Sequence, residues 1–212
     1  MKVEIFADVA CPFCFIGKRN LERALAGFDR EPVEVAWRSF QLNPDLPREV
    51  EGDMHDYLAD KYGVSREEAQ AMNERVLASA RAAGAEIELE RARPRNTFDA
   101  LRMLQLASER GRGDEMAEAL FSAYFTGSAD VADPDDLVEL AVGAGIEREA
   151  AAEAAHGDRF ADRVRADCAE AGALGLTGVP AFIIDRSLLV SGAQPPETMR
   201  AALDQAAART GL

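Results

Sequence analysis

The sequence predicts an α/β fold in which a long helical segment interrupts a small sheet. A strand–helix–strand unit occupies about the first 40 residues, an Ala-, Glu- and Arg-rich helical stretch follows, and a strand–strand–helix unit ends the chain. The 212 residues, 48% of them apolar, suffice for one domain, or for one domain with an insertion. We expect residues 1–50 and 174–212 to form the sheet domain and residues 51–173 to form an inserted helical domain.

The first unit is defined by two periodicities. Residues 2–7 form a short apolar strand, and residues 32–40 alternate, with apolar side chains at Val33, Val35 and Trp37. Between them a helix of about 15 residues begins near Pro12, a residue type suited to the first helical turn. A strand, a helix and a strand of these lengths predict a right-handed parallel βαβ unit.

The middle of the chain, from about 52 to 173, is predicted to be helical throughout. Ser65 and Glu68 form a capping box that opens a helix ending near Ala83, before Gly84. Further helices begin near residue 96 and at Asp133, a capping residue followed by proline.

The last 40 residues return to strands. Residues 178–184 are mostly apolar, a turn covers 185–187, and a second strand at 188–191 completes a predicted hairpin. A final helix is expected from about Pro196 to Ala208.

A pair of cysteines stands where the first strand passes into the first helix. Cys14 shares one helical face with Leu21, Leu25 and Phe28, so it is expected to be buried. Cys11 lies just ahead of the helix, where free N–H groups and the positive end of the dipole stabilise a thiolate. The two thiols are therefore predicted to differ: Cys11 exposed and nucleophilic, Cys14 sheltered and able to resolve a mixed disulfide.

A metal site is the alternative for this pair. Structural zinc requires four ligands, normally two such pairs, and only Cys168, His55 and His156 remain elsewhere. Both histidines are expected on the surface, and Cys168 is expected to act as a small buried apolar residue on a helix face. We therefore predict a redox-active disulfide, with no metal and no bound cofactor.

Charge and composition exclude several other classes. The formal net charge is −14, which argues against nucleic-acid and anionic-membrane partners because both need a basic surface. No apolar run is long enough for a membrane span, and the first residues lack the pattern of a signal peptide. The expectation is a cytoplasmic protein without a disulfide framework, in which a CxxC pair is catalytic.

Blocks of sequence spread over nearly the whole chain resemble one family. The chain is similar to DsbA-like thioredoxin-fold proteins, specifically their FrnE-like dithiol–disulfide oxidoreductase branch. The resembling blocks are Asp8 with Cys11-Pro12-Phe13-Cys14-Phe15-Ile16-Gly17-Lys18, then Phe40-Gln41-Leu42-Asn43-Pro44, Asn96-Thr97-Phe98-Asp99-Ala100, Gly178-Val179-Pro180 and Ser191-Gly192-Ala193-Gln194-Pro195-Pro196-Glu197.

The resemblance implies properties that periodicity does not reach. It implies a thioredoxin fold with a helical lid, and a cis peptide bond at Pro180 facing the cysteines. Val179 would present backbone groups to an extended substrate, and Pro12 and Phe13 would support the thiols. The activity implied is thiol–disulfide exchange on protein or peptide substrates, reset by a reducing partner such as glutathione or thioredoxin, with glutathione as a candidate co-substrate.

Other residues near the cysteines carry two interpretations each. Asp8 either assists proton transfer or accepts hydrogen bonds from loop N–H groups. Asn96 and Thr97 either begin a helix or contact substrate. Phe13 and Phe15 are expected to form an exposed apolar patch, which would suit an unfolded substrate or a second copy of the chain. Ile5 occupies the position where many thioredoxin-like enzymes bury an acid.

Two other functions remain open at this point. The first is a glutathione-dependent isomerase or transferase of the kappa or 2-hydroxychromene-2-carboxylate isomerase kind, although these enzymes usually carry Ser where Cys11 stands and lack a second cysteine. The second is a non-catalytic binding module that uses the acidic helical surface.

Overall fold

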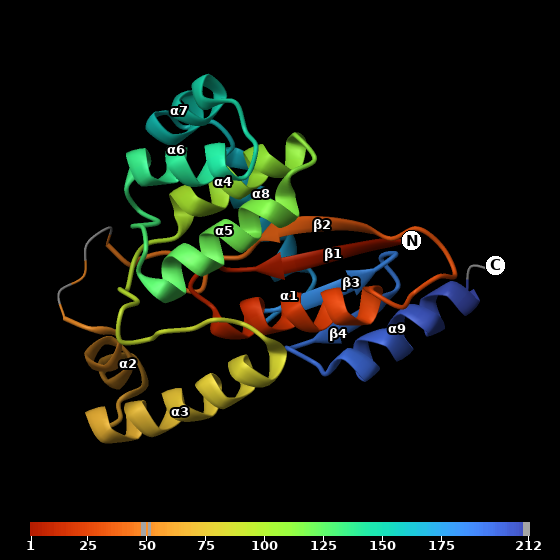
Figure 1. Cartoon of the computed structure of the whole chain (residues 1–212), viewed down its shortest axis with the longest axis horizontal. Coiled ribbons are helices and arrows are strands. Elements are labelled where there is room, and N and C mark those ends of the chain that lie inside the picture. The colour runs from red at the N-terminus through yellow and green to blue at the C-terminus, as the bar shows by residue number, and fades with distance from the viewer. Residues whose placement is uncertain (48–49, 51, 210–212) are drawn as a thin grey trace.

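The chain contains a mixed four-stranded sheet with the strand order β2-β1-β3-β4, which lies between helices (Figure 1). The computed structural model describes residues 1–47, 50 and 52–209. Strands β1 (Lys2–Ala7) and β2 (Glu34–Ser39) are parallel, whereas β3 (Ala181–Ile184) runs antiparallel to β1, and β4 (Leu188–Ser191) antiparallel to β3. Ile5 pairs with Trp37 on one side and Phe182 on the other. This sheet, with its helices, is the predicted thioredoxin fold.

Helices cover both faces of the sheet. Helix α1 (Pro12–Leu25) lies on the face that carries Ile5 and Phe182, with α9 (Pro196–Arg209) beside it. The other face carries Phe6, which packs with Ile183 and with Ala171 of α8 (Ala161–Ala173). Successive apolar side chains along a strand therefore point to opposite faces of the sheet and pack against two separate layers of helices.

The residues between β2 and β3 form the helical insertion. Its helices are α2 (Met54–Tyr62), α3 (Arg66–Ala83), α4 (Phe98–Glu109), α5 (Gly113–Thr126), α6 (Pro134–Gly143), α7 (Arg148–His156) and α8. The predicted capping box of Ser65 with Glu68 is present, and Asp133 caps α6 through the N–H groups of Asp135 and Asp136. Within the described residues, no helix is both long and apolar enough to cross a membrane.

The helix boundaries predicted near Ala83 and residue 96 are confirmed, but the description of residues 52–173 as helical throughout was wrong for residues 85–97, which form no helix or strand. Gly84 adopts the left-handed conformation that ends α3. The N–H of Glu88 then donates to the carbonyl of Phe125, a partner from α5. The segment then makes a turn, in which the N–H groups of Arg91 and Ala92 donate to the carbonyl of Glu88, and leads to α4 as an irregular strap.

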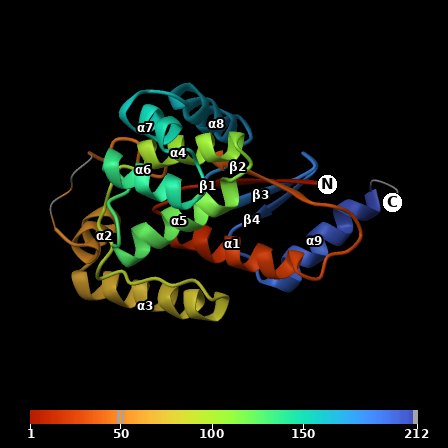
Figure 2. The same cartoon turned by 45° about the horizontal axis from the view of Figure 1, so that its top comes forward.

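Helix α1 is sandwiched between the sheet and the insertion, and α3 and α5 contact it on the side away from the sheet (Figures 1 and 2). The ring of Phe15 stacks on Phe121 of α5, with 5.2 Å between the ring centroids and 10° between the ring planes. Because α1 is covered on two sides, more of its residues are buried than the one apolar face predicted from the sequence. The site at the head of α1 is thus held by both layers.

A buried ionic network joins α8 to the sheet. The guanidinium of Arg38 donates to Glu4 at 2.9 Å and to Asp167 at 3.0 Å, and both carboxylates are almost fully buried. Glu4 also accepts from Arg186 in the β3–β4 turn. The predicted domain division stays a prediction: its first boundary adjoins residues 48, 49 and 51, which are outside the described part, and α8 of the insertion packs directly on the sheet.

Candidate active site

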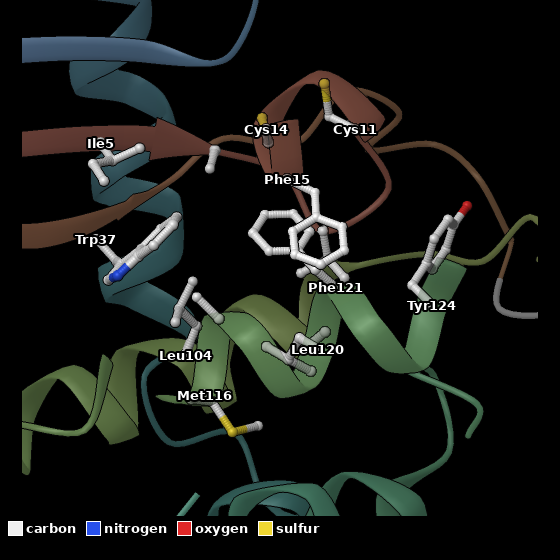
Figure 3. Close-up of a cluster of buried hydrophobic side chains, with 14 of the residues drawn as sticks. Ile5, Cys11, Cys14, Phe15, Trp37, Leu104, Met116, Leu120, Phe121 and Tyr124 are labelled. Carbon is white, nitrogen blue, oxygen red and sulfur yellow. The ribbon is translucent and has the colours of Figure 1, made fainter. Parts of the chain in front are cut away.

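Cys11 and Cys14 lie at the head of α1, where the chain turns from β1 into the helix (Figure 3). Cys11 occupies the N-cap position, without a side-chain capping bond, and Pro12 begins the helix, as predicted. Neither cysteine forms a disulfide, and the two side chains lie close enough for Cys11 to influence the Cys14 thiol.

The burial of the two thiols differs less than predicted. Cys14 is buried, with 1% of its surface exposed, but Cys11 is only 5% exposed. Its cover includes the loop before β3, where the Cys11 thiol donates to the carbonyl of Val179 across 3.5 Å. What does distinguish the two residues is access, because Cys11 lines a cleft and Cys14 does not.

The loop that covers Cys11 brings the end of the chain to its beginning. The peptide bond between Val179 and Pro180 is cis, as the family resemblance implied. Gly17 makes this approach possible, because a Cβ there would lie 3.0 Å from the Pro180 ring and 3.0 Å from the Phe182 ring. The Pro180 carbonyl in turn accepts from the N–H of Gly192, just after β4.

The charge states of the buried groups follow from their surroundings. Burial and the adjacent Cys11 raise the pKa of the Cys14 thiol well above its ordinary value. Burial also raises the pKa of Asp8, against the opposing effect of hydrogen bonds from Leu42 and Ala10. Cys14 is consequently a thiol at neutral pH and must lose its proton before it can attack a sulfur.

Asp8 is the polar centre of the site. Its carboxylate accepts from the N–H of Ala10 at 3.1 Å, from the N–H of Leu42 at 2.6 Å and from the side chain of Thr97. Its backbone N–H contacts the Cys14 sulfur. Asp8 thereby ties the CxxC loop to the connector after β2 and to the start of α4, which is the loop-anchoring interpretation of this residue.

Asn96 and Thr97 anchor the same region and do not line the cleft. Asn96 accepts from the N–H of Phe98 and from the side chain of Gln41, and donates to the carbonyl of Leu46 at 2.5 Å. Thr97 is the N-cap residue of α4 but makes no side-chain capping bond, whereas Asn96, one residue earlier, accepts from the N–H of Phe98 in the first turn. A contact of either residue with substrate stays a prediction, and in this structure their side chains bond to neighbouring loops.

Phe13 and Phe15 do not form one exposed patch, so that prediction was wrong. Phe13 is 44% exposed beside the thiols, but Phe15 is 1% exposed and stacks in the core (Figure 3). The reason is the insertion, which buries the side of α1 that the sequence pattern left open. Phe15 is excluded as a substrate contact.

The cleft beside Cys11 is the feature that sequence reasoning missed. It encloses about 500 Å³ between the head of α1 and the lid helices α2 and α3, and it is mainly apolar. Tyr62 and Met72, which are more than one-third exposed, lie on its lid side. Large apolar residues in otherwise polar helices were the available signal for this surface.

The remaining cysteine and histidines lie elsewhere. Cys168 is half-buried on α8, where burial raises its pKa and its thiol contacts the carbonyl of Ser39 at 3.7 Å. His55 contacts Asn73 at 2.9 Å, and His156 is exposed beside Asp135. In the part of the chain that the structure describes, no three His, Cys, Asp or Glu residues are grouped so that they could hold a metal ion.

A thioredoxin-like sheet that presents two thiols at a helix N-terminus, against a cis-proline loop, is the architecture of thioredoxin-fold oxidoreductases. The family model of the DSBA-like thioredoxin domain matches residues 2–204. The chain therefore belongs to the DSBA-like thioredoxin domain family.

Solved structures agree with this assignment. A probable DsbA oxidoreductase from Streptomyces coelicolor is 43% identical, with a TM-score of 0.88 over 97% of this chain and 89% of that one. Two more distant proteins share the fold alone. The cytosolic disulfide reductase DsbM from Pseudomonas aeruginosa is 16% identical (TM-score 0.66; 97% and 98% covered), and a 2-hydroxychromene-2-carboxylate isomerase is 11% identical (TM-score 0.73; 100% and 98% covered).

Proposed function

We propose that this protein is a dithiol–disulfide oxidoreductase that acts on protein or peptide disulfides through Cys11 and Cys14. The observation that carries the proposal is the contact between the two thiols at the head of α1, with only Cys11 open to the cleft. A nucleophile with access and a resolving thiol without it are the two groups that exchange requires.

The reaction follows from this geometry. In reduction, the Cys11 thiolate attacks a substrate disulfide, forms a mixed disulfide and releases one substrate thiolate. Cys14 then attacks the Cys11 sulfur and releases the second thiolate. Asp8, a buried carboxyl whose backbone contacts Cys14, is the proposed acceptor for the Cys14 proton.

The presence of Cys14 favours this function over glutathione-dependent isomerisation. A single-residue mechanism at position 11 needs no second thiol, yet here a buried one is held against the first. Full activity with glutathione in a Cys14→Ser variant would instead favour the isomerase. The structure of DsbM with glutathione supports a small thiol as the partner that resets the pair.

Insulin reduction is the test of this proposal. The wild type and Cys168→Ser should both reduce insulin, whereas Cys11→Ser should be inactive. Cys168→Ser is the matched control because it removes a thiol away from the cleft. An inactive wild type, or an active Cys11→Ser variant as expected for a non-catalytic binding module, would refute the proposal.

The direction of exchange is a separate part of the proposal. We infer reduction or isomerisation in the cytoplasm, because Pro12 and Phe13 add no charge or hydrogen-bond donor that would stabilise the Cys11 thiolate further. Equilibration with glutathione buffers measures the potential of the pair. A value above about −150 mV, close to strong oxidants, would contradict reduction.

A further inference from the structure

The charged side chains that line the cleft are unlike those of the whole chain. The sequence carries 38 acidic and 24 basic residues. Among the described residues, the cleft is lined by Lys61, Arg75 and Arg95 and by no carboxylate. A cationic lining in an acidic protein is complementary to a ligand of the opposite charge.

Two of these three cations lack an acidic partner. Arg95 is neutralised, because its Nε donates to Asp130 at 2.7 Å. Lys61 donates to the amide oxygen of Asn43 at 2.7 Å and lies over the rings of Tyr57 and Tyr62. Neither Lys61 nor Arg75 forms an ion pair with any residue that the structure describes, although the charge of Lys61 acts on the buried Asp8 and opposes the rise of its pKa. Both cations therefore face the cleft without a carboxylate in direct contact.

Tyr124 adds an uncharged donor to the same cleft. Its side chain is 5% exposed, and its hydroxyl points away from the aromatic stack of Phe15 and Phe121 (Figure 3). The described residues offer that hydroxyl no hydrogen-bond partner. Burial raises the pKa of Tyr124, so the phenol keeps its proton and can donate it to an acceptor.

We propose that the cleft is a carboxylate-recognition site, which selects thiols and disulfides that carry a carboxylate near the reacting sulfur. The inference rests on the proposed exchange at Cys11. Lys61, Arg75 and Tyr124 would hold the carboxylate, while the apolar wall around Phe13 and Met72 covers the rest of the ligand. The carboxylate can belong to a small acidic thiol or to an acidic residue beside a peptide cysteine.

The reaction step needs no further reactant. Cys11 as thiolate attacks one sulfur of the anionic disulfide, an S–S bond forms to Cys11, and one carboxylate-bearing thiolate leaves. Cys14 transfers its proton to a base and attacks Cys11, which closes the Cys11–Cys14 disulfide and releases the second thiolate. The protein loses two electrons, and the substrate disulfide gains them.

Three small disulfides of similar size test the charge preference: 3,3′-dithiodipropionate (anionic), bis(2-hydroxyethyl) disulfide (neutral) and cystamine (cationic). The rate of oxidation of the reduced protein is measured with each and divided by the rate for a free simple thiol. The overall charge of −14 predicts that cystamine is fastest, whereas the cleft predicts that dithiodipropionate is fastest. The two causes are therefore separated by the sign of the preference.

Substitutions in the cleft test which residues cause the preference for the anionic disulfide. Lys61→Gln with Arg75→Gln should lower the rate for dithiodipropionate roughly three- to tenfold, as expected for the loss of two exposed charge contacts, and change the neutral rate less than twofold. Tyr124→Phe should also slow the anion selectively. Arg81→Gln, an exposed cation on α3 outside the cleft, is the matched control and should leave the three rates unchanged.

The outcomes distinguish this inference from the proposed function. Oxidation by all three disulfides with no anion preference, or with cystamine fastest, overturns carboxylate recognition and leaves the exchange reaction intact. No oxidation of Cys11 by any of them overturns both. Peptide disulfides with Glu or Gln beside the cysteine separate the two possible origins of the carboxylate. Faster oxidation of the protein by the Glu peptide than by the Gln peptide assigns the site to acidic peptides, and equal rates assign it to small acidic thiols.

Discussion

Replacement of Asp8 tests whether one carboxylate holds the active-site loops together. Asp8→Ala removes the acceptor of two backbone N–H groups, those of Ala10 and Leu42, and of the Thr97 side chain. A buried donor left without a partner costs about 1–3 kcal/mol. Two such donors, less the cost of burying the carboxylate itself, give an expected loss of about 2–4 kcal/mol in the free energy of unfolding.

Urea denaturation of the wild type and the variant measures this loss. Asp45→Ala is the control, because Asp45 is an exposed acid in the same connector, and it should change stability by less than about 0.5 kcal/mol. A loss below 0.5 kcal/mol for Asp8→Ala as well would refute the assigned anchoring role.

The pH dependence gives a second, independent check on Asp8. Because burial raises its folded-state pKa above the unfolded value, the folded protein binds more protons between those two values. Its contribution to stability is therefore greatest at low pH and declines as pH rises through that window. The stability advantage of the wild type over Asp8→Asn should shrink from acidic to neutral pH, and an advantage that grows would contradict a raised pKa.

Two further substitutions test the packing of the site and of the lid. Gly17→Ala should lower the free energy of unfolding, measured with urea or heat, by about 1–3 kcal/mol, because the added methyl group meets the rings of Pro180 and Phe182. The control Gly172→Ala, with open space around it, should not lower the free energy of unfolding. Equal effects of the two substitutions would refute the close approach of Pro180 and Phe182 to Gly17. Ser65→Ala should lower the free energy of unfolding by about 1 kcal/mol, because it removes the capping box of α3. The control Ser79→Ala, in the same helix, should change the free energy of unfolding by less than about 0.5 kcal/mol. If Ser65→Ala and Ser79→Ala had equal effects, a stabilising role for the cap would be refuted.

Local signals predicted the elements of this fold well. The period-2 pattern, Pro12, the Ser65 box and the Asp133 cap each act within a few residues, and each marks an element that the structure contains. The path of the strap at 85–97 could not be predicted, because its backbone bonds to Phe125, far along the chain. Likewise, Glu4 lies within a strand that was interpreted as apolar, yet it is buried because Arg38 and Arg186 neutralise it.

The candidate site divides in the same way. The positions of Cys11 and Cys14 relative to the helix followed from spacing and periodicity. The cover over Cys11, the burial of Phe15 and the cleft depend on how distant segments pack, and no local pattern encodes that packing. The sequence resemblance, and not periodicity, indicated that Pro180 would lie opposite the cysteines.

Capture of a substrate on Cys11 tests the central claim most directly. In Cys14→Ser the resolving thiol is absent, so a mixed disulfide with insulin should accumulate and be released by dithiothreitol. Mass spectrometry of peptides from the complex should place the bond at Cys11, and the Cys11→Ser, Cys14→Ser double variant should capture nothing. A bond at Cys168, or equal capture without Cys11, would contradict the account.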